Sequence, residues 1–121
     1  MNRLLVMLSL IALVFRPAIS LACQPMNASE LQDKLKREPV AQLVFFASWC
    51  SSCKEHLTPD YAAKSLFIAI FDENEAATKA FRAFLGEAHR QLCVWDKDGS
   101  IAAHYAVKSL PALRTLGDAA K

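Results

Sequence analysis

Apolar and polar positions along the chain predict strands that alternate with helices. Four short apolar runs have the length and composition of strands, at residues 41–47, 66–71, 91–95 and 112–116. The first two are continuous enough to be buried on both faces of a sheet. Apolar residues at helical spacing follow the capping residues Asn27 and Asn74. This order predicts a single α/β domain with a largely parallel sheet.

Two segments do not have a single clear pattern. Residues 50–63 have helical spacing, but Pro59 inside them predicts a kink or an early end of the helix. Residues 100–107 fit either a returning strand or a short helix that Ser100 would cap. Residues 96–99 have the composition of a turn.

The first 22 residues have the layout of a secretory signal peptide. Residues 1–3 are short and positive, residues 4–15 are apolar, and the small residues Ser20 and Ala22 occupy positions −3 and −1 of a cleavage site before Cys23. The apolar run is shorter than the ~20 residues that cross a bilayer. We therefore expect an exported protein, in the bacterial periplasm, whose domain covers residues 23–121; an uncleaved membrane tether and a lipoprotein modified at Cys23 are the alternatives.

Composition and charge limit the classes of partner. The chain has 121 residues, of which 54% are apolar, and this fits one domain with a buried core. Residues 1–22 contain Arg3 and Arg16 and no acidic residue, so the remaining chain has equal numbers of basic and acidic side chains. Nothing in this balance favours nucleic acid as a partner.

Cys50 and Cys53 stand where the predicted strand 41–47 ends and the predicted helix begins. The free N–H groups and the positive dipole end of a helix stabilise a thiolate, and they can lower the pKa of a cysteine there from ~8.5 to between ~3.5 and ~7.5. We therefore expect Cys50 to be the attacking thiol and Cys53, one turn further on, to be the resolving thiol. This chemistry uses the cysteines themselves, so no cofactor and no metal is expected.

The sequence offers too few ligands for a structural metal site at the cysteines. A structural zinc site takes four ligands, and Cys23 and Cys93 do not form a second CxxC. His56 would complete a three-ligand metal site with Cys50 and Cys53, or it would simply lie on an exposed helix face. Cys93 is expected to be a buried free cysteine that packs as a small apolar residue, with a disulfide to Cys23 as the alternative.

Two segments resemble the thioredoxin superfamily, and within it the exported TlpA/ResA-like thiol–disulfide oxidoreductases. They are WCSSC at residues 49–53, after a buried strand, and residues 71–113, which contain DKDG and VKSLP. The resemblance implies a thioredoxin-like α/β fold with a mostly parallel central sheet flanked by helices. It also implies a cis bond before Pro111, and a substrate-binding surface formed by Trp49, Leu110 and Pro111. Cysteine-containing proteins would be the substrates, and an upstream donor would supply electrons.

Details of the resemblance concern which residue transfers protons and whether the protein reduces or oxidises its partners. Val44 occupies the position of the buried acid of thioredoxins. The subgroup also has an acid after the CxxC, but here Glu55 lies one place before that position and His56 occupies it, so either residue, or neither, transfers protons. No histidine lies between the two cysteines, and Leu110 before the proline resembles the reductive members. A reductant of partner proteins is therefore expected. A copper or metal delivery protein of the same fold and a non-catalytic interaction protein are the alternatives.

The chain ends at Lys121, where the family continues with an antiparallel strand and a closing helix. The fold is therefore expected to be C-terminally truncated, and the strand at residues 112–116 to have a bare outer edge. Because a bare strand edge tends to pair with another chain, a homodimer or a partner that covers the edge is expected. The alternative is that residues 100–107 fold over the edge.

Overall fold

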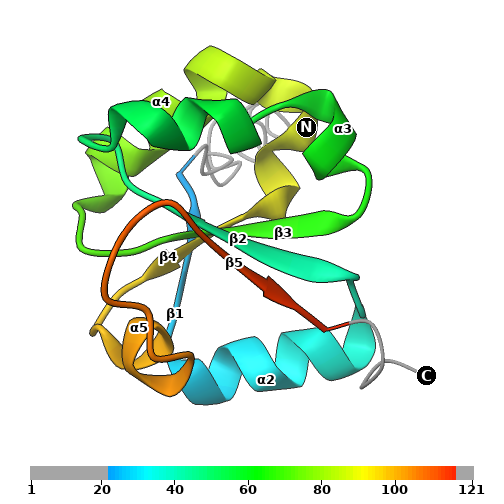
Figure 1. Ribbon diagram of the computed structural model, residues 1–121. Coiled ribbons are helices and arrows are strands. Elements are labelled where there is room, and N and C mark those ends of the chain that lie inside the picture. Colours follow the sequence, from blue (N-terminus) through cyan, green and yellow to red (C-terminus); the bar gives the residue numbers. More distant parts are fainter. Residues whose placement is uncertain (1–21, 117–121) are drawn as a thin grey trace, which may run out of the picture.

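The computed structural model describes residues 22–116, so the predicted signal peptide at residues 1–22 lies almost wholly outside the described residues, as do residues 117–121. Five strands form one sheet in the order β1-β4-β3-β2-β5 (Figure 1). Their bounds are β1 (Gln24–Met26), β2 (Gln42–Phe46), β3 (Ser65–Ala69), β4 (Cys93–Asp96) and β5 (Ala112–Thr115). The four predicted strands are confirmed, with ends that differ by up to two residues from those predicted.

Helices cover both faces of this sheet (Figure 1). One face carries α3 (Pro59–Ala62) and α4 (Asn74–Leu85), with the 3₁₀ helices η1 (Ser51–His56) and η2 (Glu87–Leu92), and the other carries α2 (Ala28–Arg37) and α5 (Ser100–His104). Alternate residues of β2 point to opposite faces, so that Val44 and Phe46 join one buried cluster while Leu43 and Phe45 join the other. The expected α/β fold, a sheet with helices on its faces, is confirmed.

The expected largely parallel sheet is wrong in one respect, because the sheet is mixed. The pairs β1–β4, β4–β3 and β3–β2 are parallel, but β5 pairs antiparallel with β2. The physical reason lies in α5, whose five residues span only about 7.5 Å at ~1.5 Å per residue. This short helix does not carry the chain back across the sheet, so β5 begins at the edge where β4 ends and runs in the opposite direction (Figure 1).

The helix starts predicted from local sequence signals are only partly confirmed. The capping box of α2 is confirmed, because Asn27 Oδ1 accepts from Glu30 N at 2.8 Å and Glu30 Oε1 accepts from Asn27 N at 3.0 Å. Asn74, predicted to cap α4, is instead its first residue, and the N-cap is Glu73. The helical alternative for residues 100–107 is confirmed by α5, but its N-cap is Gly99, and Ser100, predicted to cap it, is its first residue.

Asp96 and the β4–α5 turn show how a buried acid holds α5 in place. Asp96 is only 6% exposed, and its two carboxylate oxygens accept from the backbone N–H groups of Ile101 and Ala102, each at 3.0 Å. Helix N-termini leave such N–H groups without partners inside the helix. Asp96 therefore does more than form the turn that the sequence predicts.

The outer edge of β5 has no paired strand among residues 22–116. Arg114 in β5 nevertheless donates from Nε to the carbonyl oxygen of Tyr105 at 3.2 Å, so the turn after α5 lies against this strand. The expected homodimer through this edge stays a prediction.

Candidate redox site

Cys50 and Cys53 form a disulfide at the edge of the sheet where β2 ends. The Cys53 side chain is buried, with 1% of the residue exposed, whereas Cys50 is half-buried and packs at the margin of the same apolar cluster. Only one of the two sulfurs therefore belongs to a residue that an incoming molecule can reach. The roles expected for the two cysteines, attacking and resolving, stay a prediction.

The helical segment after Cys50 is interrupted before Pro59, as expected, but its first part is a 3₁₀ helix. Cys50 itself is the N-cap of η1, a 3₁₀ helix of six residues, and a separate helix α3 begins at Pro59. Pro59 is the first residue of α3, the position where a proline costs no helical hydrogen bond. Cys50 therefore stands at the start of a short 3₁₀ helix instead of an α-helix, and the expectation that the helix start stabilises its thiolate stays a prediction. Cys50 Sγ lies 3.8 Å from the hydroxyl of Ser52, which can stabilise a thiolate by donating to it.

Pro111 lies at the same edge of the sheet as the disulfide, and its bond to Leu110 is cis, as expected. The antiparallel register pairs Phe45 with Ala112, so the next position of β5 toward this edge, Pro111, lies beside the end of β2. Leu110 packs against both buried clusters. The topology thus brings residues more than fifty positions apart to one place, with Pro111 half-buried beside the strand that leads to Cys50.

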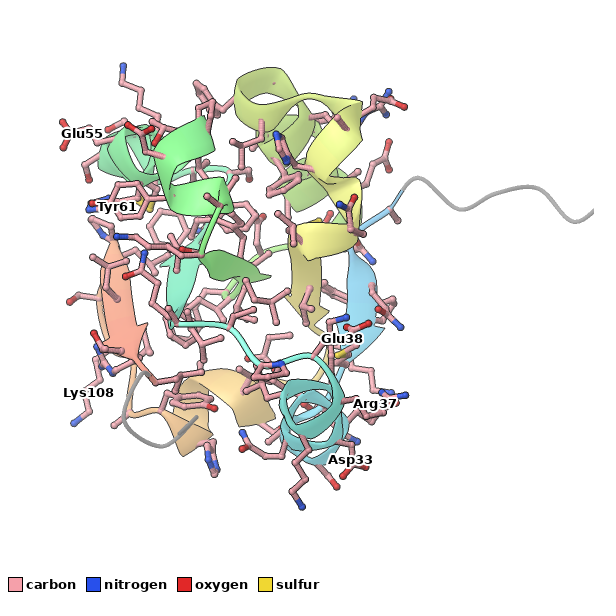
Figure 2. The ribbon with its side chains drawn as sticks, turned by 90° about the vertical axis from the view of Figure 1, so that its right-hand side faces the viewer. Asp33, Arg37, Glu38, Glu55, Tyr61 and Lys108 are labelled. Atoms are coloured by element: carbon pink, nitrogen blue, oxygen red, sulfur yellow. A yellow bond between two sulfur atoms is a disulfide. The ribbon has the colours of Figure 1, made fainter. Side chains whose placement is uncertain are left out.

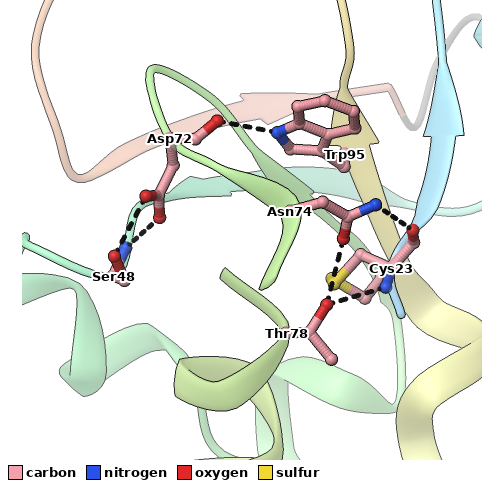
Figure 3. Close-up of a disulfide and its surroundings, with 7 residues drawn as sticks. Cys23, Ser48, Asp72, Asn74, Thr78 and Trp95 are labelled. Carbon is pink, nitrogen blue, oxygen red and sulfur yellow. Dashed lines mark hydrogen bonds between the residues drawn. A yellow bond between two sulfur atoms is a disulfide. The ribbon is translucent and has the colours of Figure 1, made fainter. Parts of the chain in front are cut away.

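Two loops at this edge are joined by a hydrogen-bond network. Asp72 accepts from the backbone N–H of Ser48 at 2.6 Å and from its hydroxyl at 3.0 Å (Figure 3). Trp49 donates from Nε1 to the carbonyl oxygen of Phe71 at 2.9 Å, and Trp95 donates to the carbonyl oxygen of Asp72 at 2.8 Å (Figure 3 shows the second bond). The loop after β3 therefore holds the residues that immediately precede Cys50.

The two candidates for proton transfer lie differently. Glu55 is exposed and lies at the periphery of the molecule, in the region of Tyr61 (Figure 2). His56 is half-buried, its ring meets that of Tyr61 edge-on at 5.1 Å between centroids, and its Nδ1 is buried without a hydrogen-bond partner. The expected exposed position of His56 on a helix face is therefore wrong. An unpaired buried nitrogen is costly, so this one, three residues after Cys53 in the chain, calls for an explanation.

A second disulfide joins Cys23, just before β1, to Cys93 at the start of β4, so the expectation that Cys93 is a free cysteine is wrong. Both residues are 2% exposed and belong to the cluster that includes Cys53. The backbone of Cys23 is held as well, because its N–H donates to Thr78 Oγ1 at 2.9 Å and its carbonyl accepts from Asn74 at 3.0 Å (Figure 3). This disulfide is part of the core and is not accessible in the way that Cys50 is.

The alternative of a metal site has little geometric support. Across residues 22–116, no group of three or more His, Cys, Asp or Glu side chains gathers as metal ligands would, and Cys50 and Cys53 are bonded to each other.

None of the helices within residues 22–116 is long and apolar enough to cross a membrane.

Three residues of this site were missed from the sequence, namely Ser48, Ser52 and Asp72. Asp72 had a usable signal, because it directly follows a buried strand, and residues there meet those of neighbouring parallel strands at one edge of the sheet. Ser48 in a loop and Ser52 in η1 carry no distinctive signal in the sequence, and only the contacts of the folded chain single them out.

The comparisons with known proteins add no relative. No family model, no curated protein and no solved structure matches this chain. The site is therefore interpreted from its own residues: it is an accessible cysteine bonded to a buried one, beside a cis-proline, at the edge of a mixed sheet in an α/β domain.

Proposed function

We propose that this chain has a thioredoxin-like fold and is an exported thiol–disulfide oxidoreductase that exchanges disulfides with cysteine-containing partner proteins. One observation carries the proposal: the Cys50–Cys53 disulfide has one accessible and one buried member, at the edge where the cis bond to Pro111 also lies. A purely structural disulfide that closes so short a loop removes little chain entropy, so stability alone explains the pair poorly.

In the reductive direction the reaction has two steps. The Cys50 thiolate attacks one sulfur of the partner's disulfide, a Cys50–partner disulfide forms, and the partner's other sulfur leaves as a thiolate that takes up a proton. The Cys53 thiolate then attacks Cys50 Sγ, the Cys50–Cys53 bond forms, and the second partner sulfur is released. Two electrons have passed from the dithiol to the partner, so an upstream dithiol donor must restore the reduced pair.

The Cys53 thiol must lose a proton before the second step, and within the proposal His56 accepts it. In a 3₁₀ helix, residues three apart project from the same side, which places His56 on the side of Cys53. A neutral imidazole has one nitrogen that accepts a proton, and the Nδ1 of His56 is free of other hydrogen bonds. Glu55 has no comparable position, because it follows Cys53 by two residues and is exposed.

Export and the reductive direction belong to the same proposal. Two disulfides in one small domain fit an oxidising compartment such as the bacterial periplasm. A lipid thioether on Cys23 fits less well, since the same sulfur is bonded to Cys93 in the core. The reductive direction rests on the absence of a histidine between the cysteines and on Leu110, and the potential of the pair in equilibrium with glutathione tests it.

Trapping of the mixed disulfide tests the exchange and the role of each cysteine. Reduced Cys53→Ser protein should react with a chromophoric aromatic disulfide and retain one aromatic thiol on Cys50, because no resolving thiol is left to release it. Cys50→Ser should react much more slowly, because Cys53 is buried. The protein with both substitutions is the matched control, and its trapped amount sets the background.

Two results would contradict the proposal. If Cys50→Ser traps the aromatic thiol while Cys53→Ser does not, the roles are reversed. If the reduced wild-type protein turns over neither the aromatic disulfide nor oxidised glutathione, the non-catalytic alternative explains the chain better.

A further inference from the structure

Phe71 combines a strained backbone conformation with an exposed aromatic side chain. Its φ is 55°, in the left-handed region that bulky residues rarely adopt because the side chain crowds the backbone there. Its side chain is 52% exposed, although the residues of β3 before it are all buried. Glycine or asparagine would adopt this conformation with less strain. Such outliers concentrate at functional sites, so a function for the exposed ring is the natural explanation.

The location of Phe71 indicates which function. Its carbonyl oxygen accepts from Trp49 Nε1 at 2.9 Å, and Trp49 is the residue directly before Cys50. The next residue, Asp72, holds Ser48 through two hydrogen bonds, so the loop of Phe71 is firmly joined to the loop of Cys50. Trp49 is itself 62% exposed. Two exposed aromatic residues thus lie on joined loops beside the accessible cysteine.

We propose that Phe71 is a specificity-determining residue that contacts an apolar side chain next to the reacting cysteine of the partner protein. The inference rests on the proposed function. A partner sulfur must come within a bond length of ~2.05 Å of Cys50 Sγ, so the residues that flank the partner's cysteine must pass over the neighbours of Cys50. Phe71 and Trp49 are uncharged aromatic residues there, and aromatic rings of this kind bind apolar side chains by removing their surface from water.

The experiment compares three disulfide substrates. Two are synthetic peptides, each closed by one disulfide and identical except that leucine or serine flanks the cysteines; the third is oxidised glutathione. The measurement is the rate at which protein with a reduced Cys50–Cys53 pair reduces each one. The wild-type protein should reduce the leucine peptide faster than the serine peptide.

The test variant is Phe71→Asn, which keeps a residue suited to the left-handed conformation. It should reduce the leucine peptide about tenfold more slowly, equivalent to ~1.4 kcal/mol, while the rates with the serine peptide and glutathione stay the same. Phe84→Asn is the matched control, because Phe84 is also exposed, at 49%. It lies near the far end of α4, ten residues after the first residue Asn74, which is about 15 Å along the helix at ~1.5 Å per residue. It should behave as the wild type does.

The outcomes separate this inference from the proposed function. If Phe71→Asn retains the wild-type ratio of the leucine and serine rates, or loses all three rates equally with an unchanged urea midpoint, Phe71 does not select substrates. If the wild-type protein reduces none of the three disulfides, the proposed function is wrong and the inference falls with it. A lower urea midpoint for Phe71→Asn would also count against the inference, because it would mean that the ring stabilises the fold.

Discussion

Replacing Cys23 and Cys93 together with alanine should destabilise the protein by about 4 kcal/mol. The disulfide joins residues 70 positions apart. A cross-link that closes a loop of this length lowers the entropy of the unfolded chain by about 15 cal/mol/K, which is worth about 4 kcal/mol at room temperature. Domains of this size have a total stability of about 5–15 kcal/mol, so the loss is a large part of it.

The natural comparison within the chain is the second disulfide. Cys50 and Cys53 are only three positions apart, and the same relation gives about 2 kcal/mol for removing their cross-link. Both double variants replace two cysteines with two alanines. The difference of about 2 kcal/mol between them therefore measures the effect of loop length rather than the loss of sulfur atoms.

Urea unfolding followed by circular dichroism measures both variants against the oxidised wild-type protein. With an m-value of about 1–3 kcal/mol per M, the midpoint of the Cys23→Ala/Cys93→Ala variant should fall by about 1.3–4 M. Its m-value should also rise, because an unfolded chain without the long cross-link exposes more surface. Equal losses in the two double variants, or a loss below about 1 kcal/mol in the first, would refute the reasoning from chain entropy.

Two further predictions concern acidic residues outside the redox site. Asp96→Ala should cost about 2–3 kcal/mol in unfolding free energy, because two buried backbone N–H groups of α5 lose a charged acceptor; Asp98→Ala, at an exposed carboxylate, is the control and should cost much less. The hydrogen bond from Lys97, 2.9 Å away, holds the pKa of Glu30 below its ordinary value of 4.5, so its stabilising effect is present above that pH and is lost as the pH falls through the lowered pKa. The difference in stability between Glu30→Gln and the wild type should therefore be present at neutral pH and disappear in acid, and a difference that persists in acid would contradict the assignment.

The sequence by itself determined the local elements and the position of the Cys50–Cys53 pair. Strands β2 and β3 coincide with the continuous apolar runs 43–47 and 66–71, and α2 begins with a capping box between Asn27 and Glu30. The types of these elements therefore follow from residues that are close together in the chain. The position of Cys50 after a buried strand is also local information. The cis bond before Pro111 was predicted from a family resemblance, and this one bond is confirmed.

Only the tertiary structure decided which distant segments meet. β1 has three residues, one of them Pro25, and no strand pattern; it forms because it pairs with β4 at the edge of the sheet. The partner of Cys93 depends on that same pairing, since β1 brings Cys23 to the start of β4. The physical reason is that periodicity reports which face of a single element is buried, whereas pairing depends on contacts between elements. The same holds for the left-handed backbone of Phe71, whose carbonyl is held by Trp49 from another loop.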